Sequence, residues 1–126
     1  MGKLATQPNT RRAKNVILFV GDGMSLPTVT ASRIYAGQKK GLDGESYSLA
    51  FEEQLPYTAF SKTYTHDAQV ADSAPTATAM TSGVKSVNGT IGVSQLVQLN
   101  VCASQKAAEV RSIFELAEQA GLATGI

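Results

Sequence analysis

An aspartate followed directly by a serine, Asp72-Ser73, is the pair of residues in this sequence best suited to chemistry. Small residues surround the pair in the stretch VADSAPTATAMTSG, residues 70–83, and predict a helix over residues 73–80. A helix amino terminus carries roughly half a positive charge and unpaired N–H groups, so it binds anions. Ser73 could cap this helix, which is the common role of serine there. Alternatively, its hydroxyl could attack the phosphorus of a bound phosphate, if a base or a metal ion activates it.

A second chemically capable residue, Asp22, lies between two glycines in GDG, directly after the apolar run NVILFV at residues 15–20. That run is rich in β-branched residues and does not alternate, which predicts a strand buried on both faces of a parallel sheet. Open α/β sheets bind ligands beyond the carboxyl ends of their strands, and the glycines would let a metal ion approach Asp22 closely. GDG is also ordinary turn chemistry, so a turn is the alternative. His66, the single histidine, lies seven residues before Ser73, so a metal ion held partly by Asp22 is the activator that the sequence offers.

Helical and extended patterns alternate along the chain, which predicts an α/β fold with a largely parallel central sheet and helices on both faces. The expected helices cover residues 25–36, 46–55, 73–80 and 106–120, the expected strands residues 15–20 and 57–65, and the expected loop residues 82–94. Four aromatic residues are expected in the core: Tyr47, Phe51, Tyr57 and Phe60.

The final residues LATGI, 122–126, look like the beginning of another strand. A parallel strand needs neighbours to satisfy its backbone groups. We therefore expect the chain to be the front part of a longer α/β protein, with a sheet that is incomplete in this chain.

The composition fits a globular protein and argues against several functions. The chain has 43% hydrophobic and 17% charged residues and a net charge of +1. Its Lys and Arg residues are scattered and it has no Trp, so the sequence predicts no nucleic-acid-binding surface. No stretch reaches the roughly 18 apolar residues of a membrane span. Residues 1–12 lack the apolar core of a signal peptide. Cys102 is the only cysteine, so it is either a buried apolar residue or half of a bridge to something outside this chain.

Three stretches together resemble the amino-terminal part of the alkaline phosphatases. They are AKNVILFVGDGMS at residues 13–25, QVADSAPTAT at residues 69–78 and SVNGTIGV at residues 86–93. The serine motif is specific, whereas GDGM is shared more widely across the superfamily, and the spacing is closer to the animal-type branch. The resemblance implies that residues 1–126 are the amino-terminal portion of a single catalytic domain, with residues 1–13 as a flexible arm.

The resemblance also implies a reaction, the metal-dependent hydrolysis of phosphate monoesters through a phosphoserine intermediate. Ser73 would be the nucleophile, would ligate one of two zinc ions when free, and would donate its backbone N–H to a phosphate oxygen. Asp22 would be a metal ligand between that zinc and one magnesium ion, and Asp72 would orient the arginine that clamps the phosphate. The zinc ions would stabilise the entering and leaving oxygens. The complete protein would be a homodimer, made as a periplasmic or secreted precursor.

The sequence departs from the family pattern in two ways. Pro75 stands where the family has Gly, Ala, Ser or Cys; a first helical turn accepts it, but it would narrow the wall near the phosphate. The phosphate-binding arginine, the zinc histidines and the other carboxylates are expected beyond this sequence, so we expect the 126 residues alone to be inactive.

Three minor candidates have ordinary interpretations. His66 is not at a family ligand position and is interpreted as a solvated loop residue. Asn88-Gly89-Thr90 is a formal glycosylation sequon, but a turn explains it. The family resemblance allows a disulfide partner for Cys102 further along the full protein.

Two other functions compete with a phosphomonoesterase. A phosphodiesterase or sulfatase of the same superfamily usually carries threonine, or a modified cysteine or serine in a different motif, so a serine in DSA favours the monoesterase. A non-catalytic fragment that completes a partner chain is the alternative from a different class.

Overall fold

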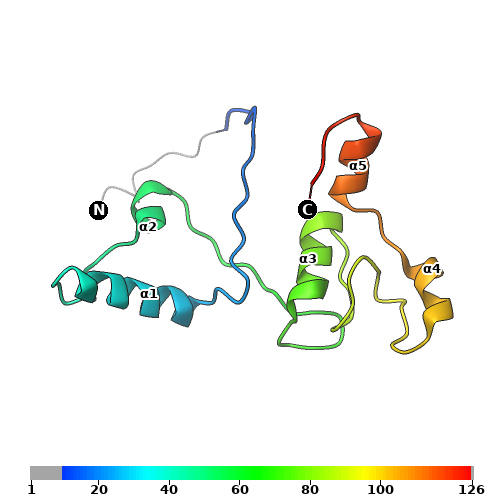
Figure 1. Cartoon of the computed structure of the whole chain (residues 1–126), viewed down its shortest axis with the longest axis horizontal. Helices are drawn as coiled ribbons and strands as arrows, with labels where there is room; N and C mark the ends of the chain where they lie inside the picture. Colours follow the sequence, from blue (N-terminus) through cyan, green and yellow to red (C-terminus); the bar gives the residue numbers. More distant parts are fainter. Residues whose placement is uncertain (1–9, 126) are drawn as a thin grey trace. The chain divides into compact units, whose positions relative to one another are not determined.

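The computed structural model describes residues 10–125, and the secondary structure of this part is helical (Figure 1). The chain divides into two units, Met1–Phe60 and Ser61–Ile126, and each is described separately. Most of the expected flexible arm, residues 1–9 of 1–13, lies outside the described residues.

Two helices form the first unit, α1 over Leu26–Lys39 and α2 over Ala50–Gln54. Both were predicted, although α2 is shorter than the expected range. Beyond α1, the chain folds back so closely that a Cβ on Gly37 would lie 2.6 Å from the Cα of Gly44. Gly44 also has a φ of 86°, a left-handed conformation that favours glycine, so the close return of the chain depends on it.

The second unit contains α3 over Ser73–Ser82, the 3₁₀ turn η2 over Cys102–Ser104, α4 over Gln105–Ala108 and α5 over Ile113–Gln119. Helices α3 and α5 are in contact, with α5 near one end of α3 (Figure 1). The predicted helix at residues 73–80 is confirmed. It continues to Ser82 and ends at Gly83, whose φ of 75° is that of a glycine C-cap. The predicted loop at residues 82–94 is confirmed from Gly83 onward.

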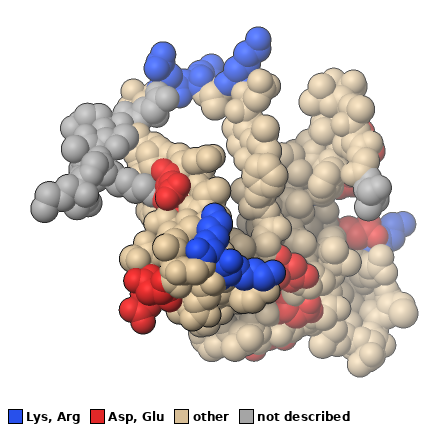
Figure 2. Space-filling view, turned by 60° about the vertical axis from the view of Figure 1, so that its left-hand side comes forward, with Lys and Arg blue, Asp and Glu red and all other residues tan. Residues whose placement is uncertain are grey.

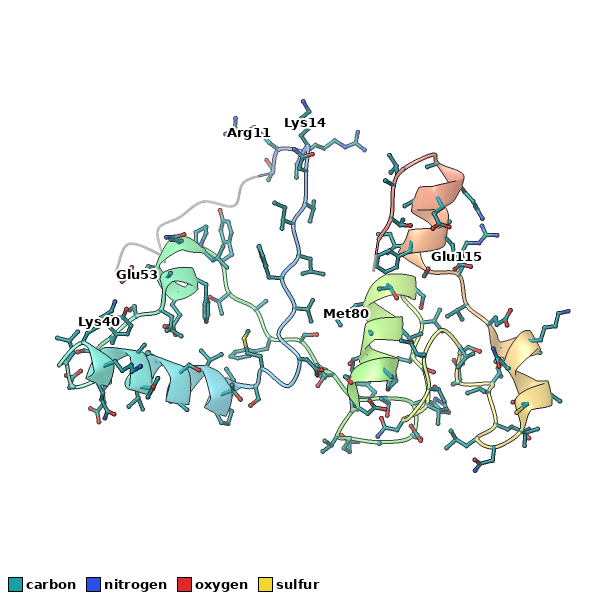
Figure 3. All side chains as sticks on the ribbon, viewed as in Figure 1. Arg11, Lys14, Lys40, Glu53, Met80 and Glu115 are labelled. Carbon is teal, nitrogen blue, oxygen red and sulfur yellow. The ribbon has the colours of Figure 1, made fainter. Side chains whose placement is uncertain are left out.

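The single helix expected over residues 106–120 is wrong, because the chain is extended between α4 and α5. Glu109 forms an isolated β-bridge with Val93 there. Helix α5 then begins as a new helix with its own cap. The carboxylate of Glu115 (labelled in Figure 3) accepts from the N–H of Ser112 at 2.6 Å, and the hydroxyl of Ser112 accepts from the N–H of Glu115 at 3.3 Å. The pattern S-x-x-E is a known helix start, so the sequence carried the signal for this break.

None of the predicted strands, at residues 15–20, 57–65 and 122–126, is formed among residues 10–125. The side chains of the first run are exposed, up to 90% for Phe19. A strand exists only where a neighbouring segment pairs with its N–H and C=O groups, and no described segment pairs with these runs. The central sheet therefore stays a prediction.

The buried residues of the described chain are few and mostly small. Val93 and Ala108 are the buried hydrophobic ones, Thr65, Thr78, Ser86 and Ser94 the buried polar ones, and Gly37, Gly44 and Pro75 are buried as well. The aromatic core expected from the sequence is wrong in three of its four members, since Phe51, Tyr57 and Phe60 are exposed and Tyr47 is half-buried. Aromatic side chains are buried only where another apolar surface covers them, and such a surface comes from tertiary contacts.

The surface of the chain carries both signs of charge. On the face shown in Figure 2, Lys and Arg form small groups separated by Asp, Glu and uncharged residues. In the part of the chain that the structure describes, no helix combines the length and the apolar character needed to cross a membrane.

Candidate active site at the start of helix α3

Ser73 is the first residue of α3 and is exposed. The cap of this helix is the preceding residue, because Oδ1 of Asp72 accepts a hydrogen bond from the N–H of Ala74 at 3.0 Å. The interpretation of Ser73 as the cap is therefore wrong. Its hydroxyl makes one contact within the described chain, 3.4 Å from Oδ1 of Asp72, which is longer than an ordinary O–H···O hydrogen bond. The hydroxyl thus lies exposed at the positive end of a helix.

The carboxylate of Asp72 is held at both of its oxygens. While Oδ1 accepts from Ala74, Oδ2 accepts from the N–H of Gly89 at 2.7 Å. The hydrogen bonds from these N–H groups stabilise the ionised carboxylate and so keep the pKa of Asp72 below its usual value. The bond from Ala74 has the larger effect, and the bond from Gly89 follows it. Asp72 is consequently a weak base towards the hydroxyl of Ser73. Whether it also orients an arginine, as the resemblance implies, stays a prediction.

A turn at Asn88-Gly89 joins Asp72 to a loop earlier in the chain. Gly89 has a φ of 78°, and the N–H of Thr90 donates to the carbonyl of Val87 at 3.3 Å, so the interpretation of this sequon as a turn is confirmed. The N–H of Asn88 donates to Oδ1 of Asp67 at 3.0 Å, and Oδ1 of Asn88 accepts from the N–H of Asp72 at 3.1 Å.

Sequence reasoning missed Asp67 and Asn88 as supports of the site. The signal was present in the chemistry of these residues, because short Asp and Asn side chains in loops often bind backbone N–H groups. Nothing in the sequence, however, says which distant N–H group each side chain binds.

Protonation of Asp67 should loosen this loop. Hydrogen bonds to its carboxylate, above all from the N–H of Asn88, hold the pKa of Asp67 below its usual value. A lowered folded-state pKa means that the ionised carboxylate stabilises the fold above pH 3.8 and that this stabilisation is lost as the pH falls through the lowered pKa. We expect Asp67→Asn to lower the urea concentration at the unfolding midpoint of the complete protein at pH 7. In acid, we expect the variant and the wild type to have the same midpoint.

Urea unfolding across a pH series measures this effect, with Glu53→Gln on α2 (Figure 3) as the control. The control removes an exposed carboxylate outside the loop, so we expect its midpoint to match wild type at pH 7. A difference between Asp67→Asn and wild type that stays constant down to the lowest pH would contradict the role of the charge.

Pro75 lies in the first turn of α3, as predicted, but it is fully buried. Residues two positions apart point to nearly opposite sides of an α-helix, so the ring faces away from the side of Ser73. The effect of Pro75 on the phosphate site stays a prediction. The missing N–H does no harm in a first turn.

Asp22 lies in the tight turn predicted as the alternative, where the N–H of Met24 donates to the carbonyl of Gly21 at 3.2 Å. Asp22 belongs to the first unit and Ser73 to the second. Within the second unit, the structure brings Asp72, Ser73 and the Asn88-Gly89 turn together into one site.

The described residues do not by themselves fit the expected metal ions. Among residues 10–125, no group of three or more His, Cys, Asp or Glu side chains could hold an ion. A catalytic zinc ion takes three protein ligands, so two zinc ions and a magnesium ion need further ones. His66 is exposed, as predicted, and Cys102 is an exposed free thiol rather than the buried residue that was one alternative.

Comparison with known proteins agrees with the motif around Ser73. The alkaline phosphatase family model matches residues 13–126. The chain is 48% identical to alkaline phosphatase of Gadus morhua over 118 residues, which is 94% of this chain. It is also 50% and 48% identical to the tissue-nonspecific isozymes of Gallus gallus and Homo sapiens over the same share. The chain spans 22–24% of the length of these relatives. From residue 13 onward, the chain therefore belongs to the alkaline phosphatase family.

Proposed function

We propose that the complete protein hydrolyses phosphate monoesters and that Ser73 is its nucleophile. The observation that carries this proposal is the position of the Ser73 hydroxyl. It is exposed at the amino terminus of α3, while the neighbouring Asp72 fills the role of the helix cap. A phosphate at this end of the helix would meet the positive pole of the helix dipole and, as the resemblance implies, the N–H of Ser73. Membership of the family supports the same reaction.

The proposed reaction has two steps. In the first, Oγ of Ser73 loses its proton and forms a bond to phosphorus, the ester P–O bond breaks, and the departing alkoxide takes up a proton to leave as the alcohol. In the second, the oxygen of a water molecule bonds to phosphorus, the bond between phosphorus and Oγ breaks, inorganic phosphate leaves, and a proton of that water returns to Oγ of Ser73. One ester and one water thus give one alcohol and one phosphate.

The cofactors of the complete protein are part of the proposal. The family resemblance implies two zinc ions and one magnesium ion, and Asp22 and Ser73 would supply two of their ligands. When bound, such ions would lower the pKa of the serine hydroxyl. Since the described residues lack a full ligand set, the proposal needs further ligands from the rest of the complete protein.

The other family properties belong to the complete protein as well. We propose the α/β fold with a central sheet, which the family implies, together with the homodimer and the periplasmic or secreted location. A monoesterase fits better than a superfamily phosphodiesterase or sulfatase, because the motif at Asp72-Ser73 carries a plain serine.

Trapping of the phosphoserine tests the proposed function. We expect the complete protein, incubated with a labelled phosphate monoester and quenched in acid, to carry the label on Ser73 in peptide mass spectra. The isolated 126 residues should carry none, because they lack a metal-binding cluster in the described part. Hydrolysis by the complete protein without a label on Ser73, or with the label elsewhere, would contradict the assignment.

A non-catalytic role is the second candidate, in which these residues only complete a partner chain. The lack of a metal-binding cluster in the described residues favours it for the isolated chain. If the isolated chain takes up the label alone, this candidate is wrong. If phosphatase activity appears only after mixing with the remaining portion of the protein, the chain completes a partner chain, as this candidate requires.

A further inference from the structure

The side chain of Asn88 binds the backbone on the approach to α3 at two points. Its Oδ1 accepts from the N–H of Asp72 at 3.1 Å, and its Nδ2 donates to the carbonyl of Val70 at 3.2 Å. Both ends of one planar amide are therefore used on residues 70–72. This pair of hydrogen bonds determines the direction in which the chain enters the helix.

The backbone of the same turn binds the side chain of Asp72. The N–H of Gly89 donates to Oδ2 of Asp72 at 2.7 Å, the shortest contact of the cluster. Asn88 is in turn anchored by its own N–H, which donates to Oδ1 of Asp67 at 3.0 Å. Asp67 also accepts from the hydroxyl of the buried Thr65 at 3.1 Å, so the turn is tied to the interior of the unit.

Ser73 lies between the atoms that this turn holds. On one side of Ser73, the N–H of Asp72 donates to the side chain of Asn88. On the other side, the N–H of Ala74 donates to the carboxylate of Asp72, which also accepts from the N–H of Gly89. Within the described chain, the hydroxyl of Ser73 has only the long 3.4 Å contact to Asp72, while the carbonyl of Ser73 accepts from the hydroxyl of Thr76 at 2.9 Å. Its position consequently depends on its neighbours rather than on bonds of its own hydroxyl.

We propose that Asn88 is a positioning residue for Ser73 in the phosphoryl-transfer reaction. The inference rests on the proposed function, because it needs Ser73 to be the nucleophile. In-line attack requires the oxygen and the phosphorus to be aligned, and a displacement of about 1 Å from a distant mutation can cost about 100-fold in rate. The side chain of Asn88 acts through the backbone N–H of Asp72, while the neighbouring Gly89 binds the carboxylate of Asp72.

Steady-state kinetics of the complete protein with a chromogenic phosphate monoester test this inference. We expect Asn88→Ala to lower kcat about 10- to 100-fold while KM stays within about threefold, since positioning acts on the transition state. Asn88→Asp keeps an acceptor for the N–H of Asp72 but loses the donor to Val70 and adds a charge near Asp67. We expect its kcat to lie between those of Asn88→Ala and wild type.

Two controls separate positioning from general destabilisation. Ser112→Ala removes the cap of α5 in the same unit without touching the Asn88 turn, and should leave kcat unchanged. Gln95→Ala removes an exposed amide of the same unit and should also leave kcat unchanged. A kcat loss in Asn88→Ala no larger than that in Ser112→Ala, or a loss confined to KM, would overturn the inference.

The same series distinguishes failure of the inference from failure of the proposed function. If Ser73→Ala is inactive and Asn88→Ala has wild-type kcat, only the positioning role is wrong. If Ser73→Ala has wild-type kcat, the proposed function itself is wrong. Should Asn88→Ala fail to fold, Asn88→Asp decides, because wild-type kcat in that variant would show that the Val70 bond does not position Ser73.

Discussion

Ser73→Ala should lower kcat of the complete protein by about a thousandfold or more, because removal of a covalent nucleophile abolishes the first step. The substitution should leave the helix intact. The cap of α3 is Asp72, which retains its hydrogen bond from Ala74, and alanine is a good helix former. Hydrolysis of a chromogenic phosphate monoester measures kcat, and circular dichroism checks the helix.

Ser82→Ala is the matched control for Ser73→Ala. It removes a serine hydroxyl from the other end of the same helix, where Oγ donates to the carbonyl of Thr78 at 2.7 Å. We expect the control to keep wild-type kcat. Activity of Ser73→Ala within about tenfold of wild type would remove Ser73 from the mechanism, because a nucleophile cannot be lost at so small a cost.

Thr78→Val should destabilise the complete protein by about 1–3 kcal/mol, the usual cost of leaving a polar group without its partner inside a protein. Thr78 is 2% exposed. Its hydroxyl donates to the carbonyl of Ala74 at 3.1 Å and accepts from the N–H of Gly92 at 2.9 Å, so it joins α3 to the loop that follows it. Valine has the same shape but leaves the N–H of Gly92 without an acceptor. Urea unfolding of wild type and variant measures the change.

Thr81→Val applies the same substitution three residues further along α3. The hydroxyl of Thr81 only donates back to carbonyls of its own helix, at 2.8 Å to Ala77 and 3.5 Å to Thr78, so valine there leaves no N–H group unpaired. We expect a change below about 0.5 kcal/mol, since such back-bonding contributes little. Equal effects of the two substitutions would show that the bond between Thr78 and Gly92 does not stabilise the unit.

The local parts of the fold were predictable because their causes are local. The small residues after Asp72-Ser73 predicted α3 within two residues of its observed end, and the glycine at position 83 ends it. The break between α4 and α5 was predictable in principle from the capping pattern of Ser112 and Glu115, and the apolar periodicity of residues 106–120 concealed it.

The extended segments were not predictable in the same way. The β-branched composition of residues 15–20 expresses a preference for a sheet, but a strand forms only when another segment pairs with it. No segment among the described residues does so, and the side chains of Val16 and Phe19 are 84% and 90% exposed. The preference of a segment for extended structure is local, whereas the formation of a strand depends on contacts with segments distant in sequence.

By itself the sequence determined the family, the nucleophile candidate Ser73 and the helix that carries it, because motif residues and helix signals are encoded over a few neighbouring positions. The cap of α3 by Asp72 is a local contact, whereas only the tertiary structure decided that Asp67 and the Asn88-Gly89 turn hold Asp72 in place. The physical reason is that a short polar side chain can bind any N–H group within reach. Which group is within reach depends on how loops 16 to 21 residues apart in sequence fold against each other.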